Sequence, residues 1–192
     1  MFIQTESTPN PLTLKFVPGE IVHPTGTAFY TNKNDAGDSP LAIRLFDIEN
    51  VTAIFFSHDF ITVTKSPEAE WEDMKPLLLT SIMDHYVAGL PVVNAQEKTP
   101  PMPTPRGSAD AQLSAEDAPI VDQIKELLET RVRPAVAQDG GDIIFHSYGD
   151  GIVHLEMHGA CAGCPSSTAT LKGGIENMLK HYIPEVIAVE AV

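Results

Sequence analysis

The chain has 192 residues and a mass of 20.8 kDa, enough for one medium hydrophobic core or two small ones. The chain has 12 lysine and arginine residues and 26 aspartate and glutamate residues, which gives a formal net charge of -14. Because no run of basic residues falls on a predicted face, nucleic acid and anionic membranes are not expected as partners. With no apolar run of about 18 residues and no signal-peptide or transit-peptide features over residues 1–6, we expect a soluble protein of a bacterial cytoplasm, or a processed protein of the mitochondrial matrix.

Residues 1–94 have the pattern of a small α/β domain. Apolar side chains alternate with polar ones over residues 12–16 and stop at Pro18-Gly19, which predicts a strand followed by a turn. Residues 51–56 and 60–64 are β-branched and aromatic runs separated by three polar residues, which predicts a hairpin.

A helix is expected after this hairpin. Ser66-Pro67 has the pattern of a cap followed by a first helical residue, and Pro76 is expected to restart the helix. Apolar residues then recur at helical spacing until Gly89, a typical helix stop. This domain shows no obvious site.

Residues 95–112 separate this domain from the rest of the chain. Four prolines fall within the six residues 100–105, and apolar periodicity is absent. That composition is typical of an extended, semi-rigid linker.

Residues 113–192 form a second predicted domain, so the fold class is α/β (α+β) with two small domains. Residues 114–117 resemble a capping box, and the turn Gly149-Asp150-Gly151 joins two strands that alternate in polarity. The element order is helix, strand, strand, helix, strand, and the predicted ranges are 120–132, 143–148, 153–157, 168–182 and 186–192.

Cys161 and Cys164 are the only two cysteines, and they lie between the second strand and the second helix of this domain. A Cys-x-x-Cys loop can chelate one metal ion or one edge of a cluster, but two thiolates are only half of a four-thiolate site. The natural completion is the same loop of a second subunit. We therefore expect a metal-bridged homodimer.

The sequence around the loop suits a soft metal. Pro165 fits the first position of the following helix, so the helix N-terminus should favour the thiolate form of both cysteines. The loop itself has no acidic residue that would repel an anionic cluster. Spacing alone does not choose between iron–sulfur, zinc, redox and haem chemistry. The pair Gly173-Gly174 within the second helix suggests close packing on the sheet or on a partner.

Several motifs together resemble one family. The second domain is similar to the NifU C-terminal domain of Nfu-type iron–sulfur proteins, and the first is similar to the N-terminal domain of the same family. The motifs that carry the resemblance are Arg-Pro-Ala-Val-Ala-Gln-Asp-Gly-Gly-Asp at 133–142, Gly-Ala-Cys-Ala-Gly-Cys-Pro-Ser-Ser at 159–167, Thr-Leu-Lys at 170–172, Ile-Pro-Glu-Val at 183–186 and the opening residues 1–19.

This resemblance implies a scaffold or carrier that holds a 4Fe-4S cluster between two subunits. Cys161 and Cys164 would be the ligands in each subunit, and the cluster would pass to apo iron–sulfur client proteins after receipt from upstream assembly factors. Two rival interpretations remain: a dithiol oxidoreductase using the same thiols, and a zinc-bridged interaction module, in which His158 has ligand-like spacing. Because catalytic triads, phosphate cradles and paired-carboxylate motifs are absent from the sequence, we expect no enzyme.

Overall fold

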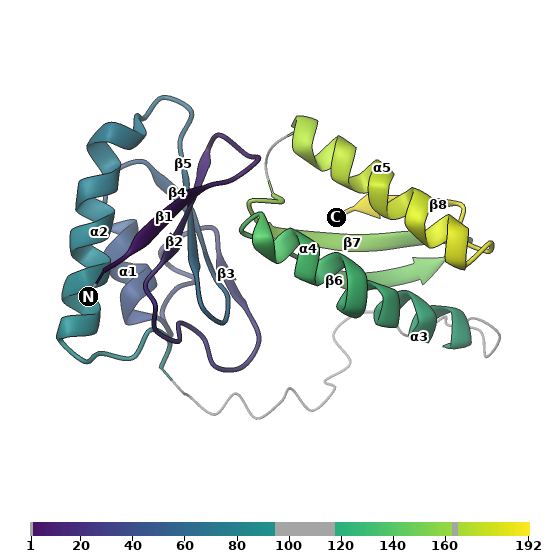
Figure 1. Cartoon of the computed structure of the whole chain (residues 1–192), viewed down its shortest axis with the longest axis horizontal. Helices are drawn as coiled ribbons and strands as arrows, with labels where there is room; N and C mark the ends of the chain where they lie inside the picture. The colour runs from purple at the N-terminus through teal and green to yellow at the C-terminus, as the bar shows by residue number, and fades with distance from the viewer. Residues whose placement is uncertain (1, 95–117, 163–164) are drawn as a thin grey trace. The chain divides into compact units, whose positions relative to one another are not determined.

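The computed structural model describes residues 2–94, 118–162 and 165–192, and the chain divides into two compact units at residues 98 and 99 (Figure 1). Each unit combines helices with an antiparallel or mixed sheet and has its own hydrophobic core. The expected two-domain α+β class is confirmed. The predicted linker, residues 95–112, and the predicted capping box, residues 114–117, lie outside the described residues.

The first unit is built on a five-stranded antiparallel sheet with strand order β1-β2-β5-β4-β3. The predicted strand is β2, and the predicted hairpin is β4 with β5, in which Ile54 lies opposite Val63. Two short strands, β1 and β3, were not expected from the sequence. The strands are β1 Gln4–Ser7, β2 Thr13–Val17, β3 Ala28–Tyr30, β4 Val51–Phe56 and β5 Ile61–Lys65.

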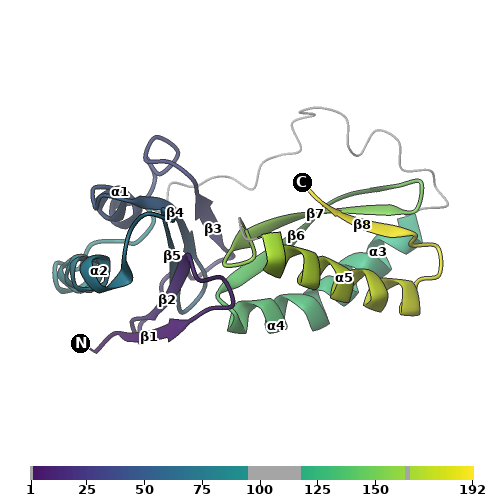
Figure 2. The same cartoon turned by 90° about the horizontal axis from the view of Figure 1, so that it is seen from above.

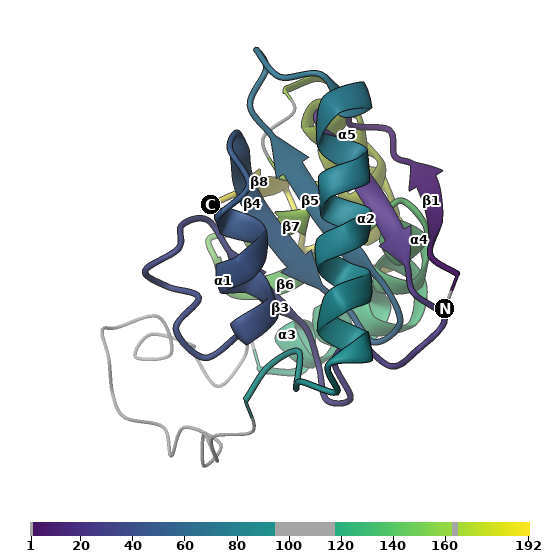
Figure 3. The same cartoon turned by 90° about the vertical axis from the view of Figure 1, so that its left-hand side faces the viewer.

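Two helices, α1 (Pro40–Phe46) and α2 (Trp71–Val87), lie side by side over one face of this sheet (Figure 3). The hydroxyl of Ser39 caps α1 by accepting a hydrogen bond from the Ala42 amide at 3.0 Å. Helix and sheet side chains then form a core that excludes water. Its fully buried members include Phe16, Leu41, Leu45, Ile54, Phe56, Ile61, Val63, Leu78 and Ile82.

The expected start of α2 was wrong. The helix begins at Trp71 after Glu70, rather than at Pro67, and Pro76 lies inside it. A proline there removes one backbone hydrogen bond, which leaves the carbonyl of Glu72 without its intrahelical partner. Pro76 is exposed, so water can solvate that carbonyl, and burial of one helical face holds the helix together.

The second unit has a three-stranded sheet of order β6-β7-β8, with β6 antiparallel and β8 parallel to β7. Its strands are β6 Gly141–Gly149, β7 Ile152–Gly159 and β8 Ala188–Ala191. A tight turn joins β6 to β7, and Asp150 and Gly151 both adopt positive φ there. The parallel pairing requires a crossover, which α5 (Pro165–Tyr182) supplies.

One face of this sheet is covered by α5 and by a helical stretch made of α3 (Ala118–Leu127), a π-helical turn (Leu128–Val132) and α4 (Arg133–Gln138) (Figure 2). The expected order of helix, strand, strand, helix, strand is confirmed. None of the helices within the described ranges is long and apolar enough to cross a membrane. The buried core consists of side chains from both layers, among them Ile124, Leu128, Val136, Ile143, Val153, Leu155, Ile175 and Leu179.

Candidate functional site

The candidate site follows the open end of the β6–β7 hairpin. Gly140 follows the end of α4 with a φ of 81°, and its carbonyl accepts a hydrogen bond from the Ala160 amide at 3.1 Å. Gly159 turns the chain out of β7 with a φ of 62°. The Cys161 amide then donates to the carbonyl of His158 at 3.3 Å, which fixes the start of the cysteine loop.

Gly141 lies against Cys161. A Cβ atom at position 141 would be 2.4 Å from the Cys161 Sγ, 2.9 Å from the Cys161 amide nitrogen and 2.9 Å from the His158 carbonyl oxygen. Two of these three atoms belong to the backbone, so a rotamer change could not relieve the overlap. The loop can occupy its position only because residue 141 has no side chain.

Cys161 is buried, with 5% of its surface exposed, and packs with the core of the second unit. Burial, with smaller contributions from the charges of Asp139 and Asp142, raises the pKa of its thiol to about 12. The expectation of a favoured thiolate is therefore wrong for Cys161 in the cluster-free subunit. The sequence showed no acidic residue within the loop, but the fold brings two carboxylates near it, Asp139 from the end of α4 and Asp142 from the start of β6.

An ion pair holds the strand next to this loop. Arg133, the first residue of α4, donates from Nε and Nη2 to the two carboxylate oxygens of Asp142, both at 2.8 Å. The Asp142 side chain is only 6% exposed and also accepts a hydrogen bond from the Ile143 amide at 2.9 Å. This bidentate contact fixes the start of α4 to the first residues of β6.

The other predicted loop residues have mixed outcomes. Pro165 is the first residue of α5, as expected, but Cys164 lies outside the described residues, and its distance to Cys161 stays a prediction. His158 is partly exposed, and its Nε2 lies 3.4 Å from a Glu156 carboxylate oxygen. Within the ranges that the structure describes, no group of three or more His, Cys, Asp or Glu residues is arranged to hold a metal ion.

The packing expected for Gly173 and Gly174 is wrong as far as the subunit's own sheet is concerned. A methyl group added at either position would find no atom within 4 Å outside the helix's own neighbouring backbone. Contact of this glycine pair with a partner subunit stays a prediction.

Sequence reasoning missed Gly141, Asp142 and Arg133 as determinants of the site. The sequence interpretation treated residues 139–142 only as a chain stop with acidic flanks, and the stop is present. Arg133, nine positions before Asp142, was the available sequence signal for an ion pair. The close approach of Gly141 to Cys161 could not be predicted in this way, because it depends on the register of β6 with β7, in which Gly141 lies opposite Gly159.

Two family models match the two domains in chain order. Residues 3–89 match the family described as "Scaffold protein Nfu/NifU N terminal", and residues 124–190 match the "NifU-like domain". A solved yeast protein titled NifU-like is 23% identical, with a TM-score of 0.46, over 50% of this chain and 87% of its own.

Two curated relatives match nearly the whole chain. The human "NFU1 iron-sulfur cluster scaffold homolog, mitochondrial" is 50% identical over 100% of this chain and 72% of its own length. The Arabidopsis thaliana "NifU-like protein 4, mitochondrial" is 47% identical over 99% of this chain and 65% of its own length, so the chain spans about two thirds of such relatives. With both domains matched in order and half of the residues identical to the human protein, the chain belongs to the Nfu family of iron–sulfur cluster scaffold proteins.

Proposed function

We propose that this protein is an iron–sulfur cluster carrier that holds a 4Fe-4S cluster between two subunits and transfers it to apo-proteins. Each subunit would contribute Cys161 and Cys164. The cluster is cargo, and the protein catalyses no covalent reaction of its own. The observation that carries the proposal is the position of the chain's only two thiols, one at each end of the connection from β7 to α5.

The number of ligands supports a shared site. A 4Fe-4S cluster is normally held by four thiolates, whereas one chain has two cysteines. A two-fold axis that brings two such loops together supplies the missing pair, because an isologous contact presents the same residues twice. Loosening the dimer then exposes cluster edges to the thiolates of an acceptor, which can replace those of the carrier one at a time.

The environment of Cys161 makes this residue a poor attacking thiol for a dithiol oxidoreductase, while Cys164 lies outside the described residues. An attacking cysteine needs a thiolate near neutral pH, and the buried Cys161 thiol, with a pKa of about 12, stays protonated there. Metal ligation also requires the thiolate, so cluster binding must release this proton. The fold then favours the return of Cys161 to its buried, protonated form after release, which suits a protein that gives its cluster away.

The names of the relatives bear on compartment and partners. Both the human and the Arabidopsis relatives are called mitochondrial, which supports the mitochondrial matrix over a bacterial cytoplasm as the place of action. Apo iron–sulfur proteins would receive the cluster, and upstream assembly factors would load it. The first domain, joined through the predicted linker at residues 95–112, would engage one of these partners.

Anaerobic reconstitution with iron and sulfide tests the proposal. The carrier should bind about four irons and four sulfides per dimer, with loading converting the protein to a dimer in analytical ultracentrifugation. Cys161→Ser and Cys164→Ser should each abolish loading while far-ultraviolet circular dichroism stays unchanged. Transfer is measured as recovery of activity by an added apo-enzyme that needs a 4Fe-4S cluster.

His158→Ala is the matched control, because it separates the carrier from the zinc-bridged module. A carrier should retain its cluster in this variant, whereas a site in which His158 is a ligand should lose metal. Full cluster binding by Cys161→Ser, a monomeric holo-protein, or catalytic reduction of insulin disulfides by the wild type would each contradict the proposal.

A further inference from the structure

A pocket in the first unit lies far along the chain from the two cysteines. Its volume is about 860 Å³, and it opens between the β2–β3 connection and the segment that follows α2. Strand β3, the connection from β3 to α1 and the last turn of α2 contribute the remaining walls. All of its described lining residues belong to the first unit.

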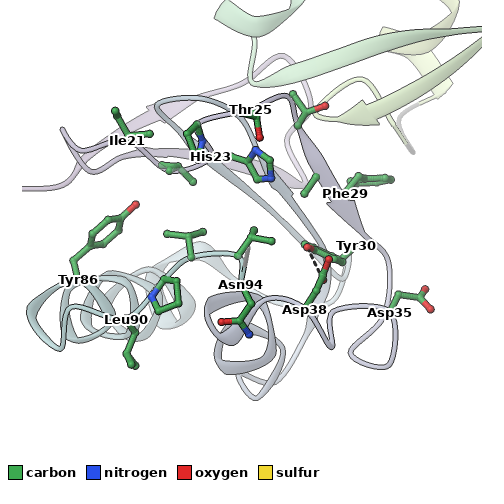
Figure 4. Close-up of a pocket in the computed structure, with 17 residues that line it drawn as sticks. Ile21, His23, Thr25, Phe29, Tyr30, Asp35, Asp38, Tyr86, Leu90 and Asn94 are labelled. Carbon is green, nitrogen blue, oxygen red and sulfur yellow. Dashed lines mark hydrogen bonds between the residues drawn. The ribbon is translucent and has the colours of Figure 1, made fainter. Parts of the chain in front are cut away.

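The pocket has an apolar end and an acidic end (Figure 4). Tyr86 lies at the apolar end near Ile21 and Leu90, and the last two side chains are 59% and 45% exposed, although both are large and hydrophobic. At the opposite end lie Asp35 and Asp38, where the Tyr30 hydroxyl donates a hydrogen bond to Asp38 at 2.9 Å. A ligand that fills the pocket must therefore be apolar at one end and basic at the other.

Two polar atoms of the lining support a bound ligand. The hydroxyl of Tyr86 and the Nδ1 of His23 are buried, and within the described part of the chain neither has a hydrogen-bond partner. Buried polar groups in folded proteins are nearly always hydrogen-bonded, because leaving one unpaired is unfavourable. The described residues contain four such atoms, and two of them, on His23 and Tyr86, meet in this one pocket, where a ligand could pair with both.

The charge of the lining identifies the polar part of the ligand. The described residues that line the pocket include two aspartates and no lysine or arginine. The chain as a whole carries a formal charge of -14, so its field also favours a cationic partner. A lysine or arginine side chain matches the acidic end.

The sheet indicates the form of the ligand. Within the described sheet β3 is an edge strand, and Ala28, Phe29 and Tyr30 of this strand line the pocket. An edge strand can pair with an added extended segment, whose alternate side chains then enter pockets beside the sheet. An extended peptide can use the edge and the pocket together, whereas a small molecule uses only the pocket.

We propose that this pocket is a docking site for an extended segment of a partner protein that carries an apolar anchor residue close to a lysine or arginine. The anchor packs between Ile21 and Leu90, the basic side chain pairs with Asp35 and Asp38, and polar groups of the segment bond to Tyr86 and His23. This binding does not depend on the cluster, because the first unit contains neither cysteine.

Peptides that bind the full-length chain are selected from a random nonapeptide phage library. Their binding is then measured by fluorescence anisotropy after labelling with fluorescein. Selected sequences should combine neighbouring apolar residues with lysine or arginine. Tyr86→Phe should weaken binding about 3- to 10-fold, because one hydrogen bond is lost. The same variant should raise the melting temperature of the ligand-free protein, because the unpartnered hydroxyl is gone. If the Tyr86 side chain only packed against its neighbours, its replacement would not combine weaker peptide binding with a higher melting temperature.

Asp35→Asn should weaken binding about 2- to 5-fold and reduce its salt dependence, as expected for one exposed charge pair. Asp59→Asn, an exposed carboxylate in the β4–β5 turn outside the pocket, is the control and should leave binding unchanged. The proposal is overturned if no peptide is selected, if acidic peptides are selected, or if both pocket variants bind like the wild type. Displacement of the peptide by octylamine at an equal concentration would also overturn it, because a small amphiphilic cation would then be the ligand.

Discussion

Replacing Gly141 by alanine should damage the cysteine loop more than its size suggests. The added Cβ would lie 2.4 Å from the Cys161 Sγ and 2.9 Å from each of two backbone atoms, all closer than real Cβ contacts allow. Overpacking of this kind costs about 1–3 kcal/mol. The φ of Gly141 is not in the left-handed region, so alanine also restricts the unfolded chain and regains about 0.4–1 kcal/mol. We expect a net loss of about 1–2 kcal/mol in the free energy of unfolding of the second unit.

Urea denaturation of the full-length chain measures this loss. Trp71, the only tryptophan, lies in the first unit, so its fluorescence should report an unchanged transition, while circular dichroism should show earlier unfolding of the second unit. Cluster loading under anaerobic conditions should fall as well, because the Cys161 sulfur must move away from the new methyl group. Gly149→Ala at the other end of β6 is the matched control, since its Cβ would have no atom within 4 Å.

The reasoning fails if Gly141→Ala and Gly149→Ala have the same stability and load the same amount of cluster. That result would mean that the loop around Cys161 can shift freely. A loss of stability with normal cluster loading would show that the loaded loop occupies a different position from that in the cluster-free chain.

Three further predictions concern other parts of the chain. His85 is fully buried, and burial lowers its pKa, so the unfolded chain takes up a proton before the folded chain does as the pH falls below about 6.5. The free energy of unfolding, followed by Trp71 fluorescence, should therefore decrease between about pH 7 and 5. His85→Gln should remove part of that decrease. Asp142→Asn breaks the bidentate contact with Arg133 and should lower the stability of the second unit by about 1–3 kcal/mol in urea denaturation. Because the Asp142 charge helps to raise the pKa of the Cys161 thiol, alkylation of Cys161 by iodoacetamide should also become faster in this variant. An unchanged alkylation rate would contradict this electrostatic contribution. Gly174→Ala places a methyl group in open space on α5 and should raise stability by about 1 kcal/mol, seen as a higher melting temperature; a lower melting temperature would show that the glycine has a structural role in the cluster-free subunit.

Long periodic segments could be predicted from the sequence. The β4–β5 hairpin, the β6–β7 hairpin with its Gly-Asp-Gly turn and helix α5 were all expected, because two-residue and 3.6-residue periods extend over most of each element. The short elements β1, β3 and α1 were missed, because three to seven residues give too little periodicity to exceed local noise. The start of α2 was misplaced because proline is a strong local signal for the first residue of a helix. Burial of Met74 and Leu78 instead holds one continuous helix together across Pro76.

The sequence predicted which residues form the cysteine motif, but it did not predict the burial and the charges around Cys161. Residue types and spacing located Cys161 and Cys164 and the first residue of α5, since these depend on neighbours in the sequence. The burial of Cys161 and the nearby carboxylates depend on strand register, which pairs Asp142 with His158 across the hairpin. For that reason, the expected thiolate character of Cys161 was wrong, and its role as a cluster ligand stays a prediction.

The parallel pairing of β8 with β7 has a consequence for biosynthesis. Because β8 follows α5 in the chain, a ribosome finishes the cysteines well before the strand that closes the sheet behind α5. The three-stranded sheet of the second unit can therefore close only after residues 188–191 have been synthesised, which makes its folding a late event relative to that of the β6–β7 hairpin.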